Sequence, residues 1–179
     1  DVAARRSLGM NLSRDDLLMN MQSVHSSLLQ PTYSWIPINV WGTSGSNFRS
    51  LASTDKLAAD SWYIGGGTDG ISIELLYSLE DPIQAAIAPL LKKHWEDHLP
   101  VEVLLREERS EEYYADIVSG TYQLALAEWA EKSPDPTRWL SDFQTSATEN
   151  FTRFSNQQFD EMFESGLNAR SHQDWHDYM

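Results

Sequence analysis

The sequence of 179 residues contains no cysteine, no long apolar run and few basic residues. The absence of cysteine excludes disulfides, thiolate metal ligands and cysteine nucleophiles. No stretch approaches the roughly 18 apolar residues of a membrane span, so we expect no direct membrane insertion of this segment. Only 13 Lys and Arg stand against 27 Asp and Glu, which gives a formal net charge of −14. This charge argues against nucleic acid as a partner, because binding to a phosphate backbone needs clustered cations.

Apolar and aromatic residues are plentiful enough for a substantial core. Hydrophobic residues make up 41% of the chain and include seven Trp. A chain of this length typically buries roughly 70% of its unfolded surface, and its length favours a single domain. Both ends carry helix-like patterns, the chain opens on Asp1, and residues 1–179 contain no signal-peptide pattern. We therefore interpret residues 1–179 as an excised segment of a longer protein.

The N-terminal part predicts helix followed by irregular chain. Apolar residues recur at three- and four-residue steps over 3–29, and Ser13 is a favourable N-cap within that stretch. Pro31 ends the helical pattern. Proline, glycine and serine then interrupt residues 31–54, which predicts loop.

The middle of the chain alternates between strands and helices. Predicted strands cover 71–77, 101–105 and 122–127, and predicted helices cover 82–98 and 110–119, with further helices at 139–143, 157–167 and 171–179. Strands that alternate with helices are joined as parallel neighbours by right-handed crossovers. The predicted fold class is α/β, with a mainly parallel sheet flanked by helices.

The segment that follows the third predicted strand is the first candidate for a binding site. In open parallel sheets, ligands bind beyond the carboxyl ends of the strands. Residues 128–137 place Trp129 beside acidic and basic residues, in a loop that two prolines stiffen. The functional interpretation is a surface that faces a ligand. The plainer alternative is an ordinary strand-to-helix turn, in which Asp135 and Pro136 start the next helix.

Four stretches of the sequence, in order along the chain, follow the motifs of one protein family. They are Arg5–Leu17, Ile71–Leu105, Gly120–Thr137 and Asn150–Asp160. Through them the chain resembles the second lobe of the family 5 extracellular solute-binding proteins, which are the oligopeptide-, dipeptide- and nickel-binding components of ABC importers. The resemblance implies that residues 1–179 form a single, incomplete C-terminal lobe with the type II periplasmic-binding-protein fold.

The resemblance also implies a function without catalysis. Two lobes would close around a small solute, a peptide by family default, and deliver it to the permease subunits of an ABC transporter. No cofactor is expected. The implied location is extracytoplasmic, either periplasmic or as a cell-surface lipoprotein.

The implied site departs from the family pattern at one position. In peptide-binding relatives, an acid three residues after a tryptophan pairs with the α-amino group of the ligand. Here Trp129 occupies the tryptophan position, but the third residue on is Lys132. A lysine suits a carboxylate, a phosphate or a sugar hydroxyl instead, unless it simply points to solvent. The candidate ligand-binding residues are Trp129, Glu131, Lys132, Ser133 and Asp135.

Histidine and glycine patterns elsewhere are weaker candidates. His94 and His98 have the helical spacing of metal ligands, as do His172 and His176. Charged neighbours indicate that the helix around His94 has a solvated face, so we predict no metal. The glycines at 65–67 precede a strand and open no helix, so they lack the geometry of a phosphate site.

Two other classes of function remain open at the level of sequence. One is a ligand-sensing domain of the same fold, fused to a DNA-binding regulator in the cytoplasm. The other is a small α/β hydrolase, which would need a reactive serine or an acid pair in a pocket. A secretory or lipoprotein signal upstream favours transport, a helix-turn-helix upstream favours the sensor, and turnover of simple esters or peptides favours the hydrolase.

Overall fold

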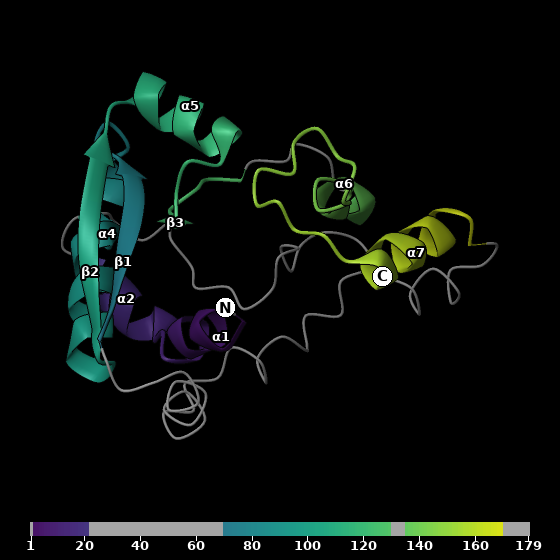
Figure 1. Cartoon of the computed structure of the whole chain (residues 1–179). Coiled ribbons are helices and arrows are strands. Elements are labelled where there is room, and N and C mark those ends of the chain that lie inside the picture. Colours follow the sequence, from purple (N-terminus) through teal and green to yellow (C-terminus); the bar gives the residue numbers. More distant parts are fainter. Residues whose placement is uncertain (1, 22–69, 130–134, 170–179) are drawn as a thin grey trace. The chain divides into compact units, whose positions relative to one another are not determined.

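The computed structural model describes residues 2–21, 70–129 and 135–169, which fall into two compact units (Figure 1). Of the described residues, the first unit contains 2–21, 70–117 and 121–128, and the second contains 118–120, 129 and 135–169. Each unit is considered separately below. The assignment of the whole chain to a single lobe stays a prediction.

A parallel sheet forms the centre of the first unit. Its strands are β1 (Ile71–Ser78), β2 (Val101–Glu108) and β3 (Leu124–Ala125), in the order β2-β1-β3. Both neighbours of β1 run parallel to it, and β1 and β2 are paired in register over their full length. The predicted α/β class with a mainly parallel sheet is confirmed.

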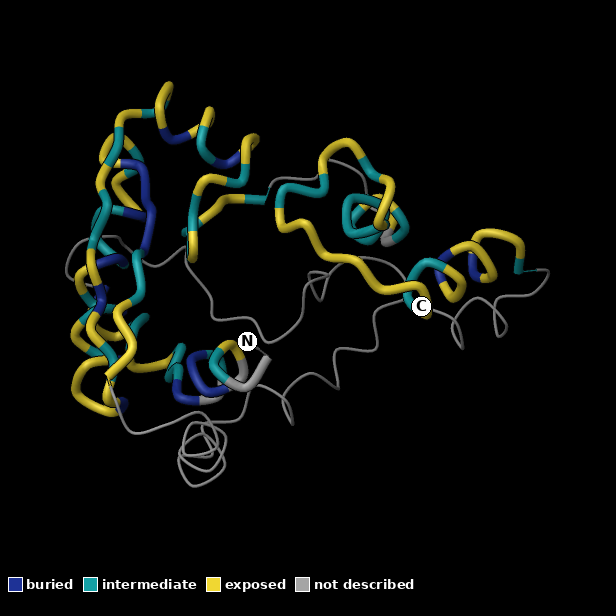
Figure 2. The backbone as a smooth tube through the Cα atoms, in the orientation of Figure 1, coloured by how far each residue is buried: buried dark blue, intermediate teal, exposed yellow. Residues whose placement is uncertain are grey.

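Helix α4 (Pro82–His98) covers one face of this sheet, as Figure 1 shows. It begins and ends where the sequence predicts. Asp81 accepts hydrogen bonds from the amides of Ile83 and Gln84, and the proline at the first helical position has no amide hydrogen to leave unsatisfied. Its inner side joins side chains from β1 and β2 in the main core, shown in dark blue in Figure 2. The buried members of that cluster are Leu8, Leu75, Tyr77, Ala88, Leu91, Trp95, Leu99 and Val103.

The N-terminal helical pattern is confirmed where the structure describes it, as two helices. Helix α1 (Val2–Met10) stops before Ser13, and α2 (Arg14–Met21) follows it. The Ser13 hydroxyl accepts a hydrogen bond of 3.3 Å from the Asp16 amide, as expected of an N-cap. The Trp95 indole donates a 3.1 Å bond to the Leu8 carbonyl, which attaches α1 to α4. The remainder of the predicted 3–29 helix and the loop at 31–54 lie outside the described residues.

Helix α5 (Ser110–Ser119) follows β2, and Tyr113 and Ile117 on it are buried. Gly120 follows the helix with φ of 72°. This left-handed conformation is the usual way in which a glycine ends a helix, and it confirms the predicted stop.

The second unit contains two further helices, α6 (Pro136–Ser141) and α7 (Gln157–Leu167). Asn156 caps α7 by accepting a hydrogen bond from the Phe159 amide. The Asp160 carboxylate on α7 also accepts a 3.0 Å bond from the Thr145 amide, which attaches the α6–α7 connection to α7. The bounds of α7 match the prediction, and the predicted helix at 171–179 lies outside the described residues.

Three details of the first unit differ from the sequence-based expectation. β2 continues to Glu108, beyond the predicted end at Leu105, and β3 covers only Leu124–Ala125. On α4, the apolar side chain of Ile83 is exposed, whereas the polar side chain of Gln84 is buried, which is the reverse of what their polarity alone favours. The Gln84 side-chain Oε1 atom accepts a 2.9 Å bond from the backbone amide of Ser78, which satisfies this polar side chain in its buried position.

Candidate functional site

The carboxyl end of β1 is fixed by hydrogen bonds to its neighbours in the first unit. After Ser78, the Leu79 amide donates a 2.8 Å bond to the Glu108 carbonyl at the end of β2. The Glu80 carboxylate accepts bonds from the Ser110 amide (3.2 Å) and hydroxyl (2.6 Å). These bonds hold the pKa of the Glu80 carboxyl below its ordinary value. The loop between β1 and α4 is thereby attached to the start of α5.

The exit of β3 is held from both sides. The Leu126 amide donates a 2.9 Å bond to the Leu76 carbonyl on β1. The Tyr113 hydroxyl on α5 donates a 2.6 Å bond to the Leu126 carbonyl. Burial raises the pKa of Tyr113 above its ordinary value, so this hydroxyl keeps its proton at neutral pH. The strand therefore leaves the sheet in a defined direction towards the exposed residues Ala127 and Glu128.

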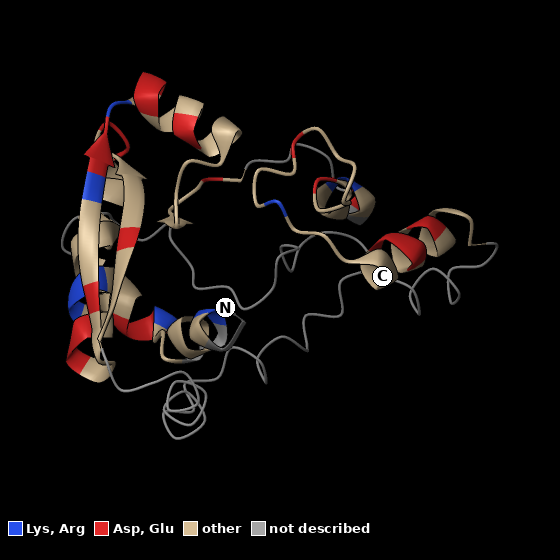
Figure 3. Cartoon of the chain, viewed as in Figure 1, with Lys and Arg blue, Asp and Glu red and all other residues tan. Residues whose placement is uncertain are grey.

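A charged cluster on the opposite side of the sheet from α4 supports this region. Arg106 on β2 forms ion pairs with Glu74 (2.7 Å), Glu108 (2.8 Å) and Asp116, and donates to the Thr121 carbonyl (3.1 Å). Figure 3 shows the basic position on β2 among acidic ones. The Arg106 side chain is 24% exposed, and these partners join both long strands, α5 and the connection to β3. Its guanidinium is committed to this network and is not a free anion site.

Trp129, the first predicted ligand residue, lies in the second unit among aromatic rings. Its ring stacks on Phe143 with centroids 5.4 Å apart and planes at 18°. Phe151 lies 6.4 Å away with its plane tilted by 55°. The three side chains are half-buried. Stacking fixes the orientation of the indole. No local spacing in the sequence indicates the two phenylalanine partners.

Asp135 starts helix α6, as the plainer sequence alternative proposed. Its Oδ1 atom accepts bonds from the Thr137 amide (2.9 Å) and hydroxyl (2.8 Å). Asp135 is also exposed, and its role in ligand binding stays a prediction. Glu131, Lys132 and Ser133 lie outside the described residues, so Trp129 and Asp135 are the candidates that the structure places.

The described histidines form no metal site. His94 Nε2 lies 2.5 Å from the Asn11 carbonyl oxygen, and His98 Nδ1 lies 2.7 Å from the His94 carbonyl oxygen. Across residues 2–21, 70–129 and 135–169, no three His, Cys, Asp or Glu side chains are grouped to hold a metal ion. His172, His176 and the glycines at 65–67 lie outside those ranges. Within the same ranges, no helix has the length and apolar character needed to cross a bilayer.

Comparison in sequence finds no matching family model, but it finds a related protein. The periplasmic oligopeptide-binding protein OppA of Salmonella typhimurium is 23% identical over 175 residues, which are 93% of this chain and 31% of OppA. The chain is thus similar to a solute-binding protein of the family that its motifs resemble. The family 5 proteins that it matches are non-enzymatic binding components of ABC transporters.

Solved structures give the same fold. The murein tripeptide binding protein MppA of Escherichia coli aligns over 99% of this chain and 36% of its own, with 19% identity and a TM-score of 0.81. A peptide-binding protein of a peptide ABC transporter aligns over 99% of this chain and 82% of its own, with 16% identity and a TM-score of 0.80. The chain thus spans about a third of OppA and MppA but most of a shorter solved chain.

Proposed function

We propose that this chain is the C-terminal lobe of an extracytoplasmic solute-binding protein of an ABC importer. The observation that carries the proposal is the sequence match to an oligopeptide-binding protein along 93% of the chain. The parallel sheet is consistent with it, since such sheets bind ligands beyond the carboxyl ends of their strands. The proposed ligand is a peptide or another small polar solute, which two lobes enclose by hinge closure before it reaches the permease.

The proposed ligand contacts lie on the chain that follows β3. Tyr113 and Leu76 fix the exit of that strand at Leu126, and the next residues lead to Trp129. Trp129 offers a ring to the ligand, while Lys132 offers a cation where peptide-binding relatives have an acid. We infer that the solute presents an anionic or hydroxyl group to Lys132 in place of a free α-amino group.

Replacing Lys132 tests this assignment in the two-lobe protein proposed above. We compare binding of tri-alanine with that of N-succinyl tri-alanine, which has a carboxylate in place of the amine. Lys132→Ala is expected to weaken binding of the succinylated peptide by about 1–3 kcal/mol, the range for a lost charged hydrogen bond. Isothermal titration calorimetry measures the change. Lys132→Asp is expected to shift the preference towards the free amine.

Lys93→Ala is the matched control, because Lys93 is exposed and pairs with Asp97 on α4. Equal affinity of wild type and Lys132→Ala for the succinylated peptide would remove Lys132 from the site. If neither peptide binds, a panel of di- to pentapeptides is titrated next. Failure of the whole panel would count against the peptide ligand itself.

A further inference from the structure

The outer edge of β2 is the side of the sheet that has no neighbouring strand among the described residues, because the strand order is β2-β1-β3 (Figure 1). The Glu108 carbonyl bonds to the Leu79 amide at the end of β1, so even-numbered residues of β2 direct their backbone groups inwards. Odd-numbered residues, Val103 among them, direct theirs outwards. Such an edge is a template on which another strand can pair.

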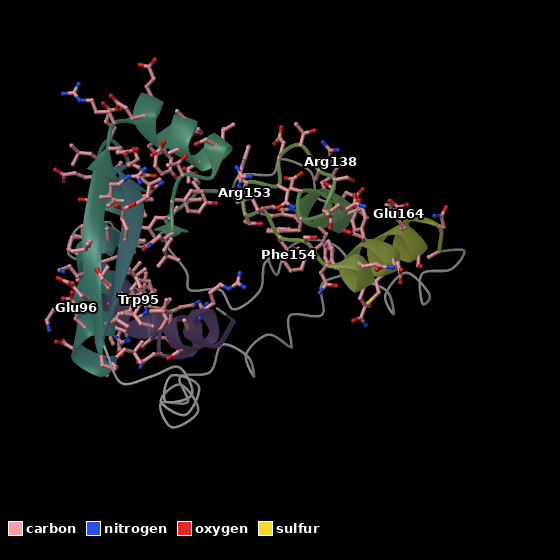
Figure 4. The ribbon with its side chains drawn as sticks, viewed as in Figure 1. Trp95, Glu96, Arg138, Arg153, Phe154 and Glu164 are labelled. Carbon is pink, nitrogen blue, oxygen red and sulfur yellow. The ribbon has the colours of Figure 1, made fainter. Side chains whose placement is uncertain are left out.

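Two side chains of α4 occupy the outward backbone groups of Val103. Lys92 Nζ donates a 2.5 Å bond to the Val103 carbonyl, and Glu96 Oε1 accepts a 2.9 Å bond from the Val103 amide. Lys92 and Glu96 are themselves joined at 2.8 Å. The Val103 side chain is fully buried, which holds the strand in this register. Figure 4 shows Glu96 beside β2, while Trp95, the preceding residue of α4, lies on the side of α1.

The electrostatics of Glu96 support this geometry. Its hydrogen bonds from Lys92 and then from the Val103 amide lower the pKa of the carboxyl. Glu96 therefore remains ionised at neutral pH and keeps both acceptor bonds. Because the two side chains have opposite charges, they block the edge without changing the net charge of the surface.

We propose that the Lys92–Glu96 ion pair closes the outer edge of β2 against strand addition by a second copy of this chain. Every copy presents the same edge, so two β2 strands can pair about a two-fold axis once Val103 is free. Pairing would need the Val103 amide and carbonyl, which the ion pair already occupies. The pair therefore acts as a specificity device that keeps the protein from associating through its sheet.

Helix α4 provides a matched control one residue further along. Lys93 and Asp97 form an ion pair with the same four-residue spacing. Their side chains are 73% and 51% exposed, against 37% and 31% for Lys92 and Glu96. Replacing either pair by alanine leaves the net charge unchanged and favours the helix equally. A difference between the two double variants therefore reports on the edge of β2.

The experiment measures self-association of the full chain by sedimentation equilibrium over a range of concentrations. Lys92→Ala/Glu96→Ala is expected to self-associate with a constant about tenfold or more above wild type, since two backbone groups become available. Lys93→Ala/Asp97→Ala is expected to match wild type. Amide hydrogen exchange at Val103, measured on the dilute monomer, is expected to be about tenfold faster in the first double variant only.

If circular dichroism shows that the Lys92→Ala/Glu96→Ala variant folds poorly, single variants of Glu96 are measured in its place. Glu96→Ala frees the Val103 amide and is expected to associate, whereas Glu96→Gln retains an acceptor oxygen and is expected to stay monomeric. Equal association of both double variants would overturn the proposal. So would a monomeric Glu96→Ala with unchanged exchange at Val103, because the edge would then be closed by something other than this pair.

Discussion

Gly120 and Arg153 show how a single residue can depend on a distant part of the chain. Gly120 has φ of 72°, and the Arg153 guanidinium donates to the Ser119 carbonyl at the end of α5. A Cβ atom at position 120 would collide with that guanidinium. Glycine is thus needed here for its backbone conformation, while an added Cβ would also displace the end of the Arg153 side chain.

Gly120→Ala is expected to destabilise the protein by about 1–3 kcal/mol, the cost of a left-handed non-glycine residue. The free energy of unfolding in urea, followed by circular dichroism, measures the change. Gly9→Ala in α1 is the matched control, since an added Cβ there meets nothing within 4 Å. It is expected to be neutral or to stabilise by about 0.5–1 kcal/mol, because alanine favours the helix. Equal effects of the two substitutions would contradict the prediction.

The sequence predicts the position of Gly120 but not its partner. A glycine after a helical pattern is sufficient to indicate a stop. The contact with Arg153 joins residues 34 positions apart at Ser119, which no local pattern reveals. The same holds for Trp129. Its place after the third predicted strand and the family resemblance make it a candidate, whereas only the structure shows its stacking on Phe143.

At the scale of elements, the sequence predicts the bounds of a helix correctly where capping residues and prolines mark its ends. Helix α4 has its predicted bounds because Asp81 and Pro82 start it and Pro100 follows it. β2 is longer than predicted because Arg106 and Glu108 satisfy each other's charge within the strand. The apolar pattern predicts that the strand ends at Leu105. Because their charges are paired, the charged residues that follow can continue it.

β3 is shorter than predicted for a related reason. The Gln123 side chain accepts a 2.8 Å bond from the Glu74 amide. A side chain thus occupies the place at which the β3 backbone would otherwise extend its pairing with β1. A pattern of apolar residues over 122–127 cannot show that a glutamine side chain replaces a backbone partner.

The attachment of α5 to β3 leads to a prediction about pH. Tyr113→Phe removes the hydrogen bond to Leu126 and is expected to lower the free energy of unfolding by about 1 kcal/mol at pH 7. Burial raises the pKa of Tyr113 in the folded state. The hydroxyl therefore makes its full contribution to the free energy of unfolding below the pKa of an unfolded tyrosine, near 10. That contribution is lost as pH rises through the higher pKa of the folded state. The difference between wild type and variant should therefore shrink above about pH 10.

Urea unfolding from pH 7 to 11 measures this effect. Tyr114→Phe is the matched control, because Tyr114 is the next residue of α5 and is 66% exposed. Its substitution is expected to change the free energy of unfolding by less than about 0.5 kcal/mol at pH 7. A Tyr113→Phe variant whose deficit stays constant across the whole pH range would contradict the role given to this hydroxyl.

At the scale of the whole molecule, the proposed function depends on a second wall for the ligand. The chain spans 31% of OppA and 36% of MppA. Small-molecule sites bury about 70–90% of the ligand surface, which a single lobe of a closing pair does not provide. A lobe that folds without its partner therefore retains only part of the contacts that hold the solute.

If the proposed function holds, the chain of 179 residues is expected to bind peptides about a hundredfold more weakly than a two-lobe protein that contains it. Each tenfold loss of affinity corresponds to about 1.4 kcal/mol of lost ligand contacts. Calorimetric titration of both with tri-alanine and N-succinyl tri-alanine measures the ratio. A cooperative thermal transition of the chain serves as the control for folding. Micromolar binding by the chain alone would place the complete site within residues 1–179, and hinge closure between two lobes would then not be needed to explain capture.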